Sequence, residues 1–159
     1  MSNTVDRDQI VRDVATALRP PVLDAGIGSA IEWQARRFEK RSGIPCLVSV
    51  PDTPIPLSDA RAIGVFRILQ EALTNVLRHA EASTVSVGLT CQQGMITLSI
   101  ADDGKGFDPH AHRQLRSFGL VGIRERVLLL GGVLDIDSQP EQGCTLTIRL
   151  PAEAGKENA

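Results

Sequence analysis

Residues 83–102, STVSVGLTCQQGMITLSIAD, contain two runs in which apolar and polar residues alternate, separated by the short polar stretch CQQG. A period of two is typical of strands that bury one face, and a short connection with glycine is typical of a hairpin. Residues 59–80, immediately before, have apolar residues at helical spacing, and Ser58 is expected to cap this helix. The change of period, from one long helix to a hairpin, indicates helices packed on an antiparallel sheet.

The rest of the chain extends this pattern on both sides. Helices are expected over residues 5–18, which two prolines end, over residues 27–43 and over residues 120–132. A strand is expected over residues 45–50, and a second hairpin over residues 133–151. We therefore expect an α/β (α+β) two-layer sandwich, with a mixed, mostly antiparallel sheet covered on one face by helices.

The composition is that of a globular protein of one domain. The chain has 159 residues, of which 42% are hydrophobic and 23% charged. A net charge of -2 and an aromatic content of 3% argue against a nucleic-acid partner. The three cysteines are too far apart for a zinc or dithiol motif and fit a reducing compartment. No apolar run is long enough to span a bilayer, so we expect a cytoplasmic chain, or the cytosolic part of a larger protein, without membrane contact of its own.

Residues 70–80, QEALTNVLRHA, place several polar side chains on one face of the expected helix. Polar residues recur there at intervals of three or four, at Glu71, Asn75 and Arg78 or His79. A solvated helix face explains Glu71 or Arg78 alone. It explains Asn75 less well, because asparagine is a mediocre helix former. The side-chain oxygen of Asn75 is a suitable ligand for Mg²⁺.

Residues 99–109, SIADDGKGFDP, follow the alternating run of the second strand. The carboxylate of Asp102 can accept a hydrogen bond from the exocyclic amine of an adenine, and Gly104 and Gly106 allow a ligand to approach the backbone. An ordinary acidic turn explains the same residues, because Asp-Gly pairs are common in hairpins. However, no strand returns promptly. Residues 103–119 have no clear period and form a long loop, which in a compact domain is often a lid.

Residues 117–127, SFGLVGIRERV, begin the next helix with Gly119 and Gly122. The unpaired N–H groups and the positive dipole end of a helix N-terminus suit a phosphate, although a glycine-weakened first turn gives the same pattern. Thr145 opens the last strand, where its hydroxyl can reach a base or a bound water. Taken alone, Thr145 is simply a residue that favours strands.

Together these motifs resemble the catalytic ATP-binding domain of sensor histidine kinases, in the subfamily whose regulators carry a helix-turn-helix output domain of the nitrate-sensor type. QEALTNVLRHA is similar to the N box of the family, DDGKGF to its first glycine box and FGLVGIRERV to its second. Residues 18–33, LRPPVLDAGIGSAIEW, are similar to the segment that leads from the dimerisation helices into the ATP domain. Four motifs in this order cover about residues 18–151 and make the resemblance specific.

The resemblance implies the Bergerat ATP-binding fold, which gyrase, heat-shock chaperone and mismatch-repair ATPases share. By this comparison Asp102 would bind the adenine amine, together with a water shared with Thr145. Asn75 would ligate Mg²⁺. Glu71 matches the acid that polarises water in related ATPases.

The other matching residues would surround the nucleotide. Residues 107–118 would form the ATP lid, with Asp103 as a solvated residue at its edge. Residues implied near the adenine or the phosphates are Gly104, Gly106, Arg78, His79, Gly119, Leu120 and Gly122.

The resemblance further implies an ATP-dependent protein histidine kinase that uses Mg²⁺ and has a response regulator downstream. The γ-phosphoryl group would pass to a histidine on a separate dimerisation domain of the same kinase, where an acid follows the histidine. The histidines of this chain precede alanine, alanine and arginine, at His79, His110 and His112. We therefore expect no autophosphorylation by this chain alone, and a monomer in isolation.

Two alternatives remain open: a protein-serine kinase of the anti-sigma-factor type, and a non-catalytic nucleotide-binding module. The lead-in over residues 18–33 argues against the first, because that class has no such segment. Under the leading interpretation, residues 1–19 are a residual helix or linker from the dimerisation region. Residues 20–151 are then the ATP-binding catalytic domain, and residues 152–159 are a flexible tail.

Overall fold

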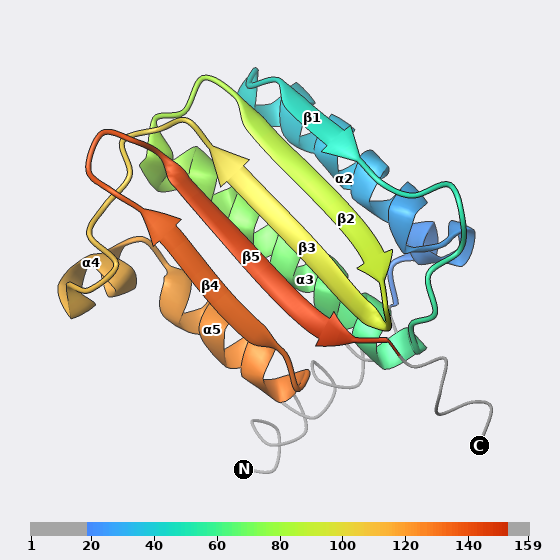
Figure 1. Ribbon diagram of the computed structural model, residues 1–159. Coiled ribbons are helices and arrows are strands. Elements are labelled where there is room, and N and C mark those ends of the chain that lie inside the picture. Colours follow the sequence, from blue (N-terminus) through green and yellow to red (C-terminus); the bar gives the residue numbers. More distant parts are fainter. Residues whose placement is uncertain (1–18, 153–159) are drawn as a thin grey trace, which may run out of the picture.

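A five-stranded sheet forms one layer of the molecule, and helices form the other (Figure 1). The computed structural model describes residues 19–152. The elements in chain order are the 3-10 helix η1 (Pro21–Ala25), α2 (Ile27–Ser42), β1 (Cys46–Ser49), α3 (Asp59–Asn75), the π-helix η2 (Val76–Ala80), β2 (Val85–Gln92), β3 (Met95–Asp102), α4 (His112–Ser117), α5 (Leu120–Leu129), β4 (Val133–Ser138) and β5 (Cys144–Pro151).

The strand order in the sheet is β1-β2-β3-β5-β4. β1 pairs with β2 in parallel, and every other neighbouring pair is antiparallel. Alternate side chains are buried, as at Val85, Val87 and Leu89 of β2. Figure 1 shows α2, α3 and α5 on one face of the sheet, while the other face carries no helix from residues 19–152. The predicted two-layer sandwich with a mixed, mostly antiparallel sheet is therefore confirmed.

The helix α3 lies behind the middle of the sheet (Figure 1). It begins as predicted, since Oγ of Ser58 accepts a hydrogen bond from the backbone N–H of Arg61 at 3.3 Å. Gly64 lets α5 pack closely, because a Cβ at this position would lie 2.7 Å from Cδ2 of Leu130. At its end α3 widens into η2, and such π-helical turns occur frequently at functional sites.

The edge strand β1 is bound to α2 by side chains. Nη2 of Arg36 donates a hydrogen bond to the carbonyl oxygen of Cys46 at 2.6 Å, and the backbone N–H of Cys46 donates to Oε2 of Glu39 at 2.7 Å. These bonds occupy backbone groups that an edge strand otherwise presents to other chains. They therefore fix the position of β1 and reduce its capacity for unwanted strand pairing.

The long loop after β3 contains the short helix α4, which the sequence did not predict. Leu115 is the buried residue of this helix, at 7% exposure. A single apolar anchor in six residues gives no periodicity to detect. We call residues 107–118 the lid segment.

Several expectations concern residues outside the described range. These are the helix over residues 5–18 and most of the tail over residues 152–159. The division of the chain into three regions therefore stays a prediction. Within residues 19–152, no helix is both long and apolar enough to cross a membrane. Cys46, Cys91 and Cys144 are free thiols.

Candidate functional site

A cavity lies where the ends of α3, β3 and β5 meet the lid segment and the start of α5. Its walls are mainly apolar, with Ile100, Leu120 and Leu146 among the lining residues, and Asn75 and Asp102 supply polar side chains. The cavity volume is about 30 Å³, which has room for on the order of two water molecules. An apolar cavity with a few convergent polar groups is the usual form of a small-molecule site.

Asp102 is the last residue of β3 and is half-buried in the cavity wall. Its Oδ1 accepts a hydrogen bond from the backbone N–H of Gly104 at 2.8 Å. Burial raises the pKa of the Asp102 carboxyl, and the backbone N–H groups of Gly104 and Cys144 partly offset this effect. An acceptor at an apolar wall favours ligands that carry a matching donor, such as an amine.

The last strand lines the cavity through Cys144 and not through Thr145. Cys144 pairs with Asp102 in the sheet, and its side chain belongs to the cavity wall. Successive side chains of a strand point to opposite faces, so Thr145, opposite Ala101 and Asp137, lies on the face of the sheet away from α3 and α5. The structure therefore does not bring Thr145 to the cavity and places Cys144 there. Burial, followed by the charge of Asp102, raises the pKa of the Cys144 thiol to about 12.

Gly104 and Gly106 let segments of the backbone meet at the rim of the cavity. A Cβ on Gly104 would lie 2.0 Å from the carbonyl oxygen of Ala80. A Cβ on Gly106 would lie 2.1 Å from the carbonyl oxygen of Gln139. Gly106 lines the cavity and Gly104 does not. In this structure Gly104 and Gly106 thus allow other backbone segments of the protein to pack closely against them, whereas the sequence suggested the close approach of a ligand.

Asn75 lines the cavity and also contacts the start of α5. Its Nδ2 donates a hydrogen bond to the carbonyl oxygen of Gly119 at 3.1 Å. Gly119, the residue before α5, has a φ of 71°, and a Cβ there would lie 2.6 Å from Oδ1 of Asn75. The end of α3 is therefore in direct contact with Gly119, the residue between the lid segment and α5.

Glu71 lies one turn before Asn75, outside the cavity wall. Its Oε1 accepts a hydrogen bond from Nε of Arg126 at 2.9 Å. A Cβ on Gly122 would lie 2.7 Å from Oε2 of Glu71. Gly122 therefore faces the carboxylate of Glu71, whose other oxygen is bonded to Arg126 of α5.

Arg78 and His79 lie in η2 and do not line the cavity. Arg78 is exposed, whereas the ring centroid of His79 is 5.6 Å from that of Phe118. Phe118 stacks on Phe107 at 4.7 Å between ring centroids, and Nζ of Lys105 lies 5.7 Å from the Phe118 ring. The two ends of the lid segment are thus held together by an aromatic stack.

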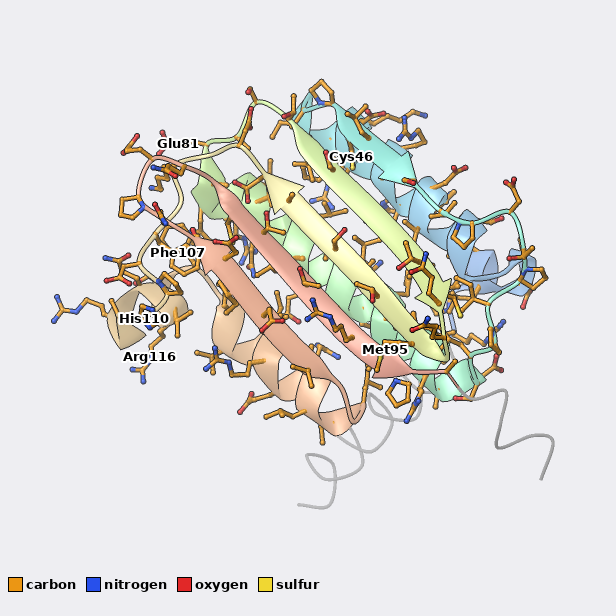
Figure 2. All side chains as sticks on the ribbon, in the orientation of Figure 1. Cys46, Glu81, Met95, Phe107, His110 and Arg116 are labelled. Atoms are coloured by element: carbon orange, nitrogen blue, oxygen red, sulfur yellow. The ribbon has the colours of Figure 1, made fainter. Side chains whose placement is uncertain are left out.

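Figure 2 shows Phe107 near the end of the sheet, whereas Arg116 of α4 points away from it. Phe107 is 3% exposed, and both Phe107 and Phe118 line the cavity. Sequence reasoning missed these two residues. The available signal was that they are two of only four phenylalanines and stand at the two ends of the expected lid.

Asp103 is exposed, in keeping with the expected solvated residue at the lid edge, and it also anchors the chain. Its Oδ1 accepts hydrogen bonds from the backbone N–H groups of Ser83 at 2.8 Å and Thr84 at 2.9 Å. Its Oδ2 accepts a further bond from the Ser83 hydroxyl. These bonds, with that of the Ser83 hydroxyl as the largest cause, hold the pKa of the Asp103 carboxyl well below its usual range. Asp103 therefore joins the end of β3 to the start of β2.

Ser138 is a second structural residue that the sequence did not indicate. It is 7% exposed, and its Oγ accepts a hydrogen bond from the backbone N–H of Phe107 at 3.0 Å. The same hydroxyl donates to the carbonyl oxygen of Gly143 at 2.8 Å. Ser138 therefore ties the first residue of the lid segment to the hairpin of β4 and β5.

The residues around the cavity fit a nucleotide with a divalent cation. Apolar walls suit a base, Asp102 offers an acceptor, and Asn75 carries an amide oxygen of the kind that Mg²⁺ accepts. Among the residues that the structure describes, no group of three or more His, Cys, Asp or Glu side chains is placed to hold a metal ion. A cation here would therefore depend on oxygens of the ligand itself, as Mg²⁺ bound with phosphates does.

Residues 60–154 match the family described as histidine kinase-, DNA gyrase B- and HSP90-like ATPases. The signal transduction histidine-protein kinase/phosphatase DegS of Brevibacillus brevis is 37% identical over 142 residues, covering 89% of this chain and 36% of DegS. The oxygen sensor histidine kinase NreB of Staphylococcus carnosus is 32% identical over 152 residues, covering 95% of this chain and 43% of NreB. The chain thus spans less than half the length of these relatives.

A solved structure supports the fold. The blue-light activated histidine kinase of Erythrobacter litoralis EL346 aligns with a TM-score of 0.73 at 22% identity, over 96% of this chain and 51% of that one. The family match includes α3, the cavity residues Asn75 and Asp102, and both hairpins. The family resemblance seen in the four sequence motifs is therefore confirmed. The chain belongs to the family of histidine kinase-, DNA gyrase B- and HSP90-like ATPases.

Proposed function

We propose that this chain is the ATP-binding catalytic domain of a sensor histidine kinase in two-component signalling. It binds ATP with Mg²⁺ and donates the γ-phosphoryl group to a histidine on a separate phosphoacceptor domain of the same kinase. The observation that carries this proposal is the cavity in which the polar side chains of Asp102 and Asn75 lie together among apolar residues. The named histidine kinases among the relatives support the reaction class.

The residues of the cavity have distinct roles in this proposal. The carboxylate of Asp102 accepts a hydrogen bond from the adenine amine, and Cys144 packs beside it. The side-chain oxygen of Asn75 ligates Mg²⁺, which offsets negative charge on the phosphates. The phosphates lie at the start of α5 near Gly119 and Gly122, where unpaired backbone N–H groups and the helix dipole favour anions.

The transfer itself needs an imidazole from outside the chain. One imidazole nitrogen forms a bond to the γ-phosphorus while the bond from that phosphorus to the β,γ-bridging oxygen breaks, and ADP leaves with the electron pair. Catalysis of such transfers depends mainly on positioning and charge neutralisation. We assign Glu71, one turn from Asn75 on the same helix, to orienting the acceptor imidazole.

Entry of the base requires a change in the lid segment. The cavity volume is about 30 Å³ with Phe118 in its wall, far below the roughly 300–1,000 Å³ of typical ligand pockets. We therefore expect Phe118 and the lid segment to move outward when ATP binds. Arg78, His79 and Lys105, which lie around this end of the cavity, then come within reach of the phosphates.

The partners and location follow from the same proposal. The acceptor histidine lies on a helical domain in the part of the kinase that this chain does not span, and a response regulator receives the phosphoryl group. The reaction takes place in the cytoplasm, where ATP is supplied. The isolated chain is expected to be a monomer.

Isothermal titration with ATP and Mg²⁺ tests the binding step. Asp102→Asn removes the negative acceptor while keeping the size of the side chain, and we expect the affinity to fall at least about tenfold. Asp52→Asn, at an exposed position in the loop before α3, is the matched control and should bind as the wild type does. Equal affinity of Asp102→Asn and the wild type would refute the adenine assignment. Failure of the wild type to bind millimolar nucleotide would favour a non-catalytic module.

Labelling with γ-³²P-ATP tests the reaction. The chain is incubated with the separately produced phosphoacceptor domain of a relative such as NreB. We expect acid-labile label on the acceptor domain and none on the chain. An acid-stable label indicates a serine kinase and contradicts the proposal, as does strong labelling of a histidine within this chain.

A further inference from the structure

The catalytic acid expected in the N box is held by a residue of another helix. Figure 1 shows α3 and α5 side by side on the same face of the sheet. Arg126 of α5 donates from Nε to Oε1 of Glu71 at 2.9 Å. Of the two side chains, Arg126 is 50% and Glu71 32% exposed. An ion pair that solvent reaches to this extent stabilises a fold only slightly. Its main effect is therefore on the position of the Glu71 carboxylate.

The absence of a side chain at Gly122 leaves room for the other oxygen of the same carboxylate. Gly122 lies one turn before Arg126, and a Cβ at Gly122 would lie 2.7 Å from Oε2 of Glu71. The carboxylate therefore rests against the backbone of α5 at Gly122 while Arg126 holds its other oxygen. Any side chain at position 122 would push the Glu71 carboxylate out of this place.

The same two helices are joined a second time at the cavity. Asn75, one turn after Glu71, donates a hydrogen bond to Gly119 at 3.1 Å. The polar residues of α3 are thus aligned against α5 at two levels, at Gly119 and at Arg126. The first of these contacts lies in the cavity wall, and the second orients a carboxylate outside it.

From this arrangement we infer that Arg126 is a positioning residue for phosphoryl transfer, which acts through Glu71. Gly122, which has no side chain, leaves the room that the Glu71 carboxylate requires. This inference rests on the proposed function, because it assigns Glu71 to orienting the acceptor imidazole. A glutamate has three rotatable side-chain bonds, and holding it in one orientation is what a reaction dominated by positioning needs. Arg126 touches neither ATP nor the acceptor in this account.

The test compares transfer to the phosphoacceptor domain by the wild type and by variants of the full chain. In Arg126→Ala we expect the rate at saturating ATP to fall at least about tenfold, with the KM for ATP changed less than about twofold. Arg126→Lys keeps the charge and should recover part of the lost rate. Arg41→Ala, an exposed arginine in the last turn of α2, is the control and should transfer at the wild-type rate.

Gly122→Ala separates positioning from stability. Alanine is a better helix former than glycine, so the melting temperature should not fall, yet displacement of the Glu71 carboxylate should lower the transfer rate as Arg126→Ala does. The double variant Glu71→Gln/Arg126→Ala should be no slower than Glu71→Gln alone, because the two residues act as one unit.

Two results would overturn the inference while leaving the proposed function intact. These are wild-type transfer rates in both Arg126→Ala and Gly122→Ala, and additive losses in the double variant. The inference is also contradicted if Arg126→Ala lowers both the melting temperature and the affinity for ATP, because a purely structural role then explains the lower transfer rate. A wild-type chain that binds ATP and transfers nothing to a competent acceptor refutes the proposed function itself.

Discussion

The side-chain amide of Asn75 donates a hydrogen bond to the carbonyl oxygen of Gly119, with 3.1 Å between Nδ2 and the oxygen. This bond joins the last residue of α3 to the residue between the lid segment and α5. In the proposed function, the oxygen of the same amide ligates Mg²⁺. Metal binding and the position of the lid therefore depend on a single side chain.

Gly119→Ala is predicted to weaken both the fold and nucleotide binding. The position has a φ of 71°, and the added Cβ would lie 2.6 Å from Oδ1 of Asn75. Gly131→Ala is the matched control, because its φ is 75° but the nearest atom to its Cβ is 3.8 Å away. The control should lose about 1–2 kcal/mol of the free energy of unfolding from the left-handed conformation alone.

Gly119→Ala should lose more than the control, and its affinity for ATP with Mg²⁺ should fall while that of the control is retained. Urea unfolding and isothermal titration measure the two quantities. Equal losses of stability in the two variants would show that the contact with Asn75 contributes nothing.

Asp103 is predicted to stabilise the protein in a pH-dependent manner. Its pKa is lowered in the folded state, chiefly by the hydrogen bond from the Ser83 hydroxyl. A group of this kind contributes stability above its unfolded pKa, near the ordinary value of 3.8, and loses it as the pH falls through the lower folded value. Asp103→Asn should therefore melt at a lower temperature than the wild type at pH 7.

The difference between the two proteins should shrink progressively below about pH 4, as the wild-type carboxyl takes up its proton. Thermal melts followed by circular dichroism from pH 2 to pH 7 give the comparison. A gap in melting temperature that is constant over this range would argue against an electrostatic origin.

Ser138→Ala is predicted to cost about 1–3 kcal/mol of the free energy of unfolding, because it leaves the buried backbone N–H of Phe107 without its acceptor. Ser86→Ala, on the exposed side of β2, should change this quantity by only about 0.5 kcal/mol or less. Chemical denaturation of the two variants measures both values. The assignment fails if Ser138→Ala is as mild as Ser86→Ala.

Cys144 offers a direct probe of the cavity. Burial raises the pKa of its thiol to about 12, so the reactive thiolate is scarce at pH 8. We expect iodoacetamide to modify Cys144 more slowly than Cys91, which lies next to the turn between β2 and β3, at the opposite end of this hairpin from Asp102 and the cavity. ATP with Mg²⁺ should slow the modification of Cys144 further and leave Cys91 unaffected.

Peptide mass spectrometry separates the two sites. Protection of Cys91 to the same degree as Cys144 would indicate general stabilisation of the protein and not occupancy of the cavity. Cys144→Thr replaces the thiol by a hydroxyl on a side chain of similar size, and it should retain ATP binding.

The amino-acid sequence by itself determined the layers of the fold and the family. The change from helical to strand periodicity at residue 83 indicated the sandwich, and the residues that match the N box and glycine boxes lie where α3, β3 and α5 end or begin. Ser58 caps α3 as predicted, since capping is a local hydrogen bond that depends on adjacent residues.

Only the tertiary structure decided which residues face one another. The alternation in β5 assigns Cys144 to the buried face, with Leu146 and Ile148, and Thr145 to the opposite face. Only the tertiary structure showed that the cavity opens on the buried face, so that Cys144 lines it. The partners of Asp103, Ser138 and Glu71 lie 20, 31 and 55 residues away. Such contacts depend on how the elements pack in three dimensions, because local sequence patterns describe each element without its neighbours.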